Sequence, residues 1–295
     1  MGRVMLLLFG LLLAPWLARA SDTPGGANKF DQGLLWKVSM PGKPANFIFG
    51  TLHVNADSVL ALPPEVEHAF AQSTTLVTEV VLDEADKGAL QLAMIASRPE
   101  LPAQLGADWP KVDGLLALRG LPARLRAHLQ PWAALVVLLK PEQQAGKDVL
   151  DVMLQRRARL AGKAVVGLES IGEQVGAISG LPRDAQIALL REAVSSFDRL
   201  ESDTAAMLRF YLAGDMARAW GAQLENRSSI PAVRAQQEAL SEALITRRNI
   251  IFAKRAMPLL KEGGTFVAVG ALHLVGESGL PALLEAEGLK IERVE

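Results

Sequence analysis

The sequence predicts an α/β or α+β fold in which a central mixed β-sheet is flanked by helices and carries a large helical insertion or cap. Two observations predict this class. Short apolar runs rich in β-branched residues alternate along the chain with longer segments whose apolar residues recur at helical spacing. One long segment, residues 84–146, is rich in Leu and Ala and is repeatedly interrupted by prolines, which indicates several short helices. Alternating strands and helices are typical of a sheet covered by helices.

The first elements predict a hairpin, a helix and a third strand. Residues 34–40 (LLWKVSM) alternate as a strand does, the turn sequence PGKPAN follows, and residues 47–50 (FIFG) form the second strand. Residues 62–73 place two prolines in a first helical turn ahead of apolar residues at helical spacing, which predicts a helix. Residues 74–82 (TTLVTEVVL) are compact and β-branched, so we expect a strand that ends over its last four residues.

The remaining elements continue the alternation after the proline-rich block, which we interpret as the insertion or cap. They are a helix at 147–162, a strand at 163–170, a helical region from 182 to about 261 broken near Gly214 and Pro231, a strand at 263–273, a helix at 278–288 and a final strand at 289–294.

Residues 1–20 are predicted to be a signal peptide, and residues 21–295 a single exported domain. The segment has a basic start at Arg3, then an apolar stretch, and it ends in the small-x-small sequence Ala18-Arg19-Ala20. Its apolar stretch is too short to span a bilayer, which takes about 20 apolar residues. An uncleaved anchor is the alternative. We therefore expect the mature protein in the periplasm or outside the cell, with no membrane-spanning segment after cleavage.

The composition limits the classes of function. Removing the two arginines of the signal peptide takes the formal net charge from -1 to -3, and no long basic run is present, so nothing indicates a nucleic-acid partner. The chain has no cysteine, which excludes disulfides, thiolate metal ligands and a cysteine nucleophile. Nothing in the sequence indicates the oligomeric state.

Polar residues follow four predicted strands at the point where each strand ends. His53 and His273 each stand three residues after a glycine, Gly50 or Gly270, in the same Gly-x-Leu-His setting. Two glutamates, Glu79 and Glu169, follow the other two strands. Because ligands of open α/β sheets lie outside the carboxyl ends of the strands, we expect these side chains to line one crevice. Imidazole and carboxylate together suit Zn²⁺, Mn²⁺ or Co²⁺. The alternative is that each histidine is a hydrogen-bonded structural residue.

A second candidate lies in the helical segment ALITRRNIIFAKR. Arg248 falls between Leu240, Leu244 and Ile251 on one predicted face. An arginine on an apolar stripe has a carboxylate partner or reaches a ligand with its fixed fork of donors. The alternative is that Arg248 extends to water, and that the neighbouring Asn249 is an amide on the helix surface.

These stretches resemble the TraB/GumN family, which is related to the Tiki metalloproteases. The resemblance is carried by GLLWKVSMPGKPANFIFGTLH, LPPEVEHAFAQSTTLVTEV, AGKAVVGLESIGEQ, RRNIIFAKRAMPLL and FVAVGALHLVGESGL, and residues 84–146 match only loosely. It implies that the two Gly-x-x-His elements and an early glutamate form a metal-dependent active site. Carried over, the family positions are Gly50, His53, Glu79, Glu169, Arg248, Asn249, Gly270 and His273.

The hypothesis that follows is a metal-dependent hydrolase whose substrate is a peptide or another small hydrolysable molecule. His53, His273 and Glu79 would be the metal ligands, and Glu169, or Glu79 if it is not a ligand, would be the general base. Arg248 would stabilise an oxyanion or hold a substrate carboxylate, with Asn249 as a second donor. One alternative is a non-catalytic envelope protein that binds a metal or a metallated ligand. A structural partner in an envelope assembly is another.

Overall fold

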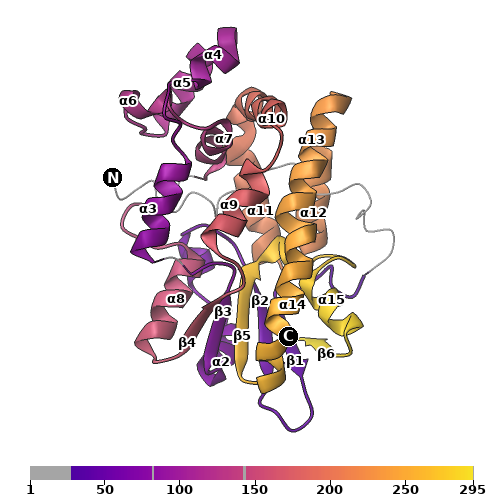
Figure 1. Cartoon of the computed structure of the whole chain (residues 1–295). Helices are drawn as coiled ribbons and strands as arrows, with labels where there is room; N and C mark the ends of the chain where they lie inside the picture. The colour runs from indigo at the N-terminus through magenta and orange to yellow at the C-terminus, as the bar shows by residue number, and fades with distance from the viewer. Residues whose placement is uncertain (1–27, 82, 142–143, 295) are drawn as a thin grey trace.

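The fold is described from a computed structural model of the chain, which covers residues 28–81, 83–141 and 144–294. It confirms the predicted class, because a six-stranded mixed sheet is surrounded by helices (Figure 1). The strands are β1 (Leu35–Ser39), β2 (Asn46–Thr51), β3 (Thr75–Thr78), β4 (Ala164–Gly167), β5 (Thr265–Gly270) and β6 (Lys290–Arg293).

The strand order is β4-β3-β5-β2-β1-β6. The predicted hairpin is present, with β1 antiparallel to β2, and β6 adds to the free edge of β1 in antiparallel fashion. The other four strands, β4, β3, β5 and β2, are parallel neighbours. Their carboxyl ends therefore lie side by side at one edge of the sheet.

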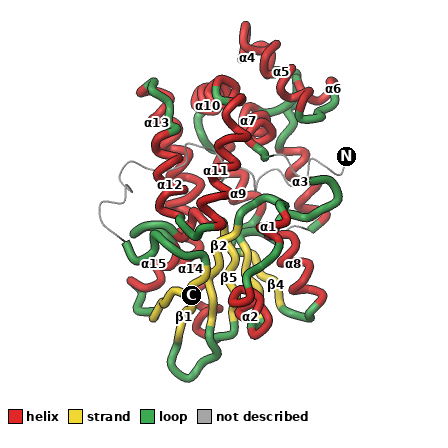
Figure 2. The backbone as a smooth tube through the Cα atoms, turned by 180° about the vertical axis from the view of Figure 1, so that it is seen from behind, coloured by secondary structure: helices red, strands yellow, loops and turns green. Residues whose placement is uncertain are grey.

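Helices cover both faces of the sheet, as Figures 1 and 2 show from opposite sides. On one face α14 (Arg247–Glu262) and α15 (Leu280–Ala286) pack Phe252 and Leu284 against Ile48 and Val267. The other face is covered by α2 (Pro64–Gln72) and α8 (Leu150–Leu160), whose Phe70 and Leu154 join the alternate strand residues Phe49 and Phe266 in a second cluster. This alternation follows from the two-residue period of a strand.

A block of helices stands over the carboxyl ends of the parallel strands (Figure 1). It is built from two segments of the chain, one before β4 in the sequence and one after it. Its centre is α7, whose residues are all buried and which packs against α10. The first segment lies within the predicted insertion. The second begins with a helix over residues 171–179 that the sequence analysis did not predict, and continues into the helical region predicted from residue 182. The helices are α3 (Glu84–Ala93), α4 (Leu101–Leu105), α5 (Trp109–Leu118), α6 (Ala123–Arg126), α7 (Pro131–Leu139), α9 (Ile171–Ser179), α10 (Arg183–Ser195), α11 (Leu200–Leu212), α12 (Met216–Glu225) and α13 (Pro231–Ser241).

The structure differs from the sequence prediction in several elements. The third strand ends at Thr78, one residue before the predicted range of 79–82, and the Val80 carbonyl beyond it accepts hydrogen bonds from the side chains of Thr78 and Gln155. A short helix that the sequence analysis did not predict, α1 (Asp57–Leu60), follows β2. A π-helical turn over Glu242–Thr246 joins α13 to α14. Its wider turn rotates the following helix, so that Phe252 is buried and Ile251, which was predicted to share the face of Arg248, is exposed.

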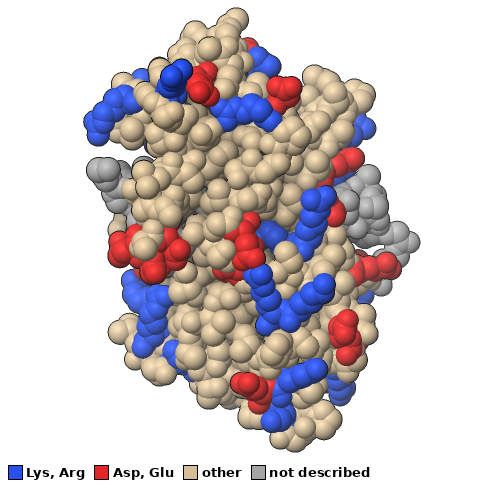
Figure 3. Space-filling model, in the orientation of Figure 1, with Lys and Arg blue, Asp and Glu red and all other residues tan. Residues whose placement is uncertain are grey.

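The predicted signal peptide, residues 1–20, lies outside the described residues. Within the part of the chain that the structure describes, no helix combines the length and the apolar character needed to cross a membrane. On the face of the molecule seen in Figure 3, Lys and Arg side chains lie in small groups among Asp and Glu.

Candidate active site

The strand order brings the four predicted strand exits together. Across the edge of the sheet the side chains come in the order Glu169, Glu79, His273 and His53, each one to three residues beyond the end of its strand. His273 lies on the 3₁₀ turn η6 (Ala271–Leu274) that follows β5. All four side chains are buried. A buried group of two imidazoles and two carboxylates requires internal partners, because unpaired charges are costly away from water.

Arg248, from the first turn of α14, is the main partner of the two glutamates. Its Nη2 donates to Glu79 Oε2 at 2.6 Å and to Glu169 Oε1 at 2.6 Å, and its Nε donates to both oxygens of Glu169 at 3.0 and 3.1 Å. Its Nη1 donates to the Leu244 carbonyl at 2.8 Å and lies 3.4 Å from His273 Nε2. These contacts employ all five N–H donors of a guanidinium.

Glu79 is held in its ionised form. Its Oε1 accepts the backbone N–H of Gly270 at 2.7 Å, which ties the end of β3 to the end of β5. Burial alone would raise the pKa of this carboxyl, but the charge of Arg248, with those of His273 and His53 and the Gly270 N–H, lowers it to about 2. Glu79 is therefore a carboxylate at neutral pH.

His273 is held as a neutral imidazole. Its Nδ1 lies 2.6 Å from Asn249 Oδ1, and the Asn249 amide nitrogen donates to the Ser278 carbonyl at 2.7 Å. Burial, together with the charges of Arg248 and His53, lowers the pKa of His273 to about 3, although Glu79 acts in the opposite direction. Because Asn249 Oδ1 can only accept, the ring proton is on Nδ1 and the lone pair is on Nε2.

His53 has a carboxylate partner that sequence reasoning missed. Its Nδ1 lies 2.6 Å from Asp151 Oδ2, and Asp151 Oδ1 accepts the Thr51 hydroxyl at 2.6 Å. Burial lowers the pKa of His53, but the charge and hydrogen bond of Asp151, with the charge of Glu79, outweigh this and raise it above its ordinary value. In the sequence Asp151 is one more acidic residue in the first turn of a helix, a common feature with an ordinary explanation.

Tyr211 joins the helical block to the same strand exit. Its hydroxyl, on α11, donates to the Gly50 carbonyl at 3.0 Å. Burial and the nearby charge of Asp151 raise the pKa of this phenol, so it stays protonated and can donate. Sequence reasoning missed this contact too, because Tyr211 and Gly50 are 161 positions apart.

Glu169 is the member of the site that borders a surface hollow. The hollow has a volume of about 510 Å³, and Ser170, Glu173 and Arg255 line it together with Glu169. Burial raises the pKa of Glu169, against the opposing charge and hydrogen bond of Arg248. A carboxyl with a raised pKa at the edge of a cavity is suited to accept and return a proton.

Gly50 is required for the close approach of the turn that carries His273. A Cβ on residue 50 would lie 2.7 Å from Leu274 Cδ1 and 3.0 Å from the backbone of Ala271. Real Cβ atoms do not approach other heavy atoms so closely, so the turn η6 would have to move. Gly270 has φ -52°, an angle open to any residue. The backbone angle of Gly270 therefore does not require a glycine.

We expect Gly50→Ala to lower the free energy of unfolding by about 1–3 kcal/mol, the usual cost of an overpacked core. Urea denaturation measures it. The matched control is Gly88→Ala in α3, where nothing lies within 4 Å of the added methyl group. There alanine should stabilise the helix by about 0.5–1 kcal/mol. Equal effects at the two positions would contradict the packing argument.

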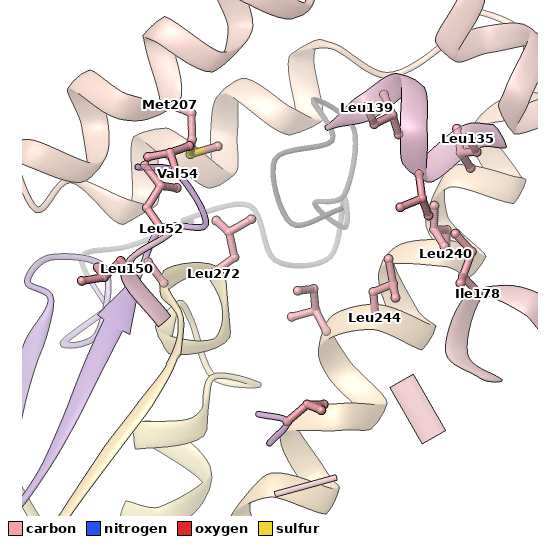
Figure 4. Packing of buried hydrophobic residues seen from close by; sticks show 14 of the residues in the cluster. Leu52, Val54, Leu135, Leu139, Leu150, Ile178, Met207, Leu240, Leu244 and Leu272 are labelled. Carbon is pink, nitrogen blue, oxygen red and sulfur yellow. The ribbon is translucent and has the colours of Figure 1, made fainter. Parts of the chain in front are cut away.

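Apolar side chains surround the polar cluster. Leu52 and Leu272, beside the two histidines, belong to the same buried cluster as Leu139 and Leu244 of the helical side (Figure 4). Their packing keeps water away from the charged groups, which strengthens every electrostatic interaction among them.

The donor atoms of His53, His273 and Glu79 are of the kind that bind a divalent metal ion. The oxygen partners on both Nδ1 atoms leave Nε2 as the coordinating atom of each ring, and Glu79 offers a carboxylate. The positions of these donor atoms differ from those of a metal site, because they do not surround a common point. No group of three or more His, Asp or Glu side chains within the described ranges is placed to hold an ion. Arg248 contacts two of the three expected ligands, Glu79 and His273.

Several proteins are similar to this chain. It is 23% identical over 253 residues to the uncharacterized protein YbaP of Escherichia coli, across 84% of this chain and 90% of that protein. It is 25% identical over 350 aligned positions to the metalloprotease TIKI homolog of Amphimedon queenslandica, across 99% and 67%. It is also 25% identical over 340 positions to metalloprotease TIKI1 of Homo sapiens, across 95% and 67%. No solved structure matches the chain.

The model of the TraB/PrgY/gumN family matches residues 34–293, from the first strand of the sheet to the last. The match includes all the buried polar residues described above. This chain therefore belongs to the TraB/PrgY/gumN family.

Proposed function

We propose that the protein is a metal-dependent hydrolase of the cell envelope or exterior that cleaves peptide bonds. The observation that carries the proposal is the buried edge of the sheet, where two imidazoles, each held through Nδ1, lie with Glu79, Glu169 and Arg248. The metalloproteases among the similar proteins support this reaction class. His53, His273 and Glu79 would hold the ion.

The charges of the cluster support a cation. Among the described residues the cluster contains three carboxylates, Glu79, Glu169 and Asp151, but the guanidinium of Arg248 is its single permanent positive charge. When these groups are ionised and both imidazoles are neutral, the cluster carries an excess of two negative charges in a water-poor environment. Such an excess is costly unless a cation neutralises it. A divalent ion has the charge required.

Each protein group has a distinct part in the proposal. When bound, the metal ion would polarise the scissile carbonyl and lower the pKa of a water molecule. Glu169, with its raised pKa and its place beside the hollow, would accept the proton of the attacking water and return it to the leaving amine. Arg248 would keep both glutamates in position. A substrate oxyanion could use Arg248 only by replacing one of its present acceptors, because all five donors are engaged. Asn249 would hold His273, since its amide groups contact His273 and Ser278.

A second candidate function is metal binding without catalysis. It is favoured by the ion pairs of Arg248 with both glutamates, which leave neither carboxylate unpaired to act as a base. The two candidates differ in the effect of Glu169→Gln. Hydrolysis requires Glu169 to move a proton, whereas binding alone does not.

Metal content is the first test. We expect the purified protein to contain about one divalent ion per chain, and the His53→Ala/His273→Ala double variant to lose it. His68→Ala is the matched control, because His68 is an exposed histidine on α2. Elemental analysis by mass spectrometry gives the content, and a peptide library assayed with Mn²⁺, Co²⁺ or Zn²⁺ gives the activity. Equal metal content in all three proteins would refute the site.

The activity assay separates the two candidates. Loss of hydrolysis in Glu169→Gln with the metal retained supports the hydrolase. Metal bound by the wild type without turnover of any library peptide supports the binding protein. Export is checked by the mass of the mature chain, which should begin at Ser21.

A further inference from the structure

Asp151 is a buried carboxylate that none of the family positions includes. It is the second residue of α8, 2% exposed, and its two oxygens contact two residues of one strand exit. The Thr51 hydroxyl, at the last position of β2, donates to Oδ1, and His53 Nδ1 lies at Oδ2, both at 2.6 Å. Asp151 therefore joins α8 to the end of β2 at the point where the chain turns towards the site.

The contacts of Asp151 make its side chain an acceptor for both residues. From the first turn of a helix, its Oδ1 accepts the Thr51 hydroxyl, and its Oδ2 lies at hydrogen-bond distance from the His53 ring. With Oδ2 as the acceptor, the proton of this hydrogen bond is on His53 Nδ1. The lone pair of His53 is then on Nε2, the atom on the other side of the ring from Asp151.

We propose that Asp151 is a positioning residue that holds His53 in the Nδ1–H tautomer and in a fixed orientation, so that Nε2 can bind the ion. The proposal rests on the proposed function, since it assigns a partner to one of the expected metal ligands. It is deduced from the two contacts of Asp151, with the Thr51 hydroxyl and with His53 Nδ1.

The second histidine is held in the same manner by a different acceptor. Asn249 Oδ1, on α14, lies 2.6 Å from His273 Nδ1, as Asp151 Oδ2 lies 2.6 Å from His53 Nδ1. One acceptor is charged and the other is neutral. A carboxylate partner increases the basicity of a histidine ligand more than an amide does. The site thus has one strong and one weaker imidazole donor, and the acceptors that hold the two rings come from helices on opposite faces of the sheet.

The first test does not involve a metal. The protein is labelled with ¹⁵N-histidine, kept in a chelator, and its imidazole nitrogens are observed by NMR. In the wild type we expect the proton of His53 on Nδ1, with the strongly downfield shift of a short hydrogen bond to a carboxylate. In Asp151→Leu the proton should move to Nε2, the tautomer that an unconstrained imidazole prefers. If Asp151→Leu fails to fold, the isosteric Asp151→Asn should still lose the downfield resonance.

The second test is the affinity for Co²⁺ or Zn²⁺ by titration. Removal of a ligand's hydrogen-bond partner costs about 10–100-fold in metal affinity, and we expect this loss in Asp151→Leu, because leucine offers no acceptor to the ring. The matched control is Asp148→Leu, which removes an acid that precedes the same helix and pairs with the mostly exposed Arg156. It should leave both the NMR spectrum and the affinity unchanged.

The outcomes separate this proposal from the proposed function. A wild-type His53 ring protonated at Nε2, or an Asp151→Asn variant with unchanged NMR signals, would overturn the role of Asp151 whether or not a metal binds. An unchanged metal affinity in Asp151→Leu would overturn it as well. If the wild type binds no metal but shows the predicted tautomer, the proposed function fails and Asp151 remains the group that positions His53.

Discussion

Replacing Arg248 by methionine should lower the free energy of unfolding by about 3–5 kcal/mol, the cost of leaving buried charges without their partner. The guanidinium is 4% exposed and is the shared partner of Glu79 and Glu169, with Nη2 2.6 Å from an oxygen of each. Methionine has a similar length but no donors. The variant therefore leaves two carboxylates facing each other in an apolar environment.

Arg255→Met is the matched control for this measurement. Arg255 lies on the same helix, α14, and makes a bidentate ion pair with Glu173, but its side chain is 43% exposed. Exposed pairs contribute about 0–1 kcal/mol, so little should be lost there. Adding Glu169→Gln to Arg248→Met should restore part of the stability, because one of the two unpaired charges is removed. Equal losses in Arg248→Met and Arg255→Met, measured by urea denaturation, would disprove the central role of Arg248.

Acid should destabilise the metal-free protein from about pH 6.5 downwards because of His273. The folded state lowers the pKa of His273 from 6.5 to about 3. Between pH 6.5 and 3, therefore, the unfolded chain binds a proton on this histidine and the native state does not. Stability then falls by about 1.4 kcal/mol for each pH unit, or about 3 kcal/mol between pH 6.5 and 4.5.

Two other titrating groups of the site act outside this pH range. The pKa of Glu79 is lowered to about 2 in the folded state, so its contribution is complete above pH 4.5 and is lost between pH 4.5 and 2. The pKa of His53 is raised, so its contribution is complete below pH 6.5 and is lost only as the pH rises through the folded value. The pKa of Glu169 is also raised, so its protonation stabilises the folded state as the pH falls towards 4.5 and opposes the effect of His273. Comparison with a variant that lacks His273 therefore isolates the contribution of this residue.

Urea denaturation at several pH values in a chelator measures this slope. His273→Gln should flatten the curve between pH 6.5 and 4.5, since glutamine does not titrate. His68→Gln, at an exposed position, should leave the slope of the wild type unchanged. Equal slopes in the wild type and His273→Gln in this range would show that His273 takes up its proton at an ordinary pKa.

The architecture around the site could be predicted from the sequence because it depends on local patterns and one general rule. Apolar runs identified the strands, and parallel strands place their carboxyl ends at one edge, so the residues after each run fall together. The expectation that Glu79 requires a partner if buried is confirmed by its ion pair with Arg248. Of the alternatives that the sequence left open for Arg248, the structure shows the carboxylate partner and not extension to water.

The other features of the site depend on tertiary contacts that cannot be predicted from a single sequence. The π-helical turn before α14 adds a residue to one turn, so a regular helical period placed Ile251 inside and gave no reason to bury Asn249. Asp151 and Tyr211 reach the site from distant helices through ordinary sequence positions. Their roles follow from tertiary packing, which no local period reveals.

The contact of Tyr211 with the Gly50 carbonyl has a practical consequence. Tyr211 is the single tyrosine of the chain, and its ring lies where the helical block meets the strand that leads to His53. Biosynthetic incorporation of fluorotyrosine would therefore place one reporter atom at the carboxyl edge of the sheet and nowhere else. Its ¹⁹F spectrum would follow any change in the contact between the helical block and β2 as a shift of one resonance.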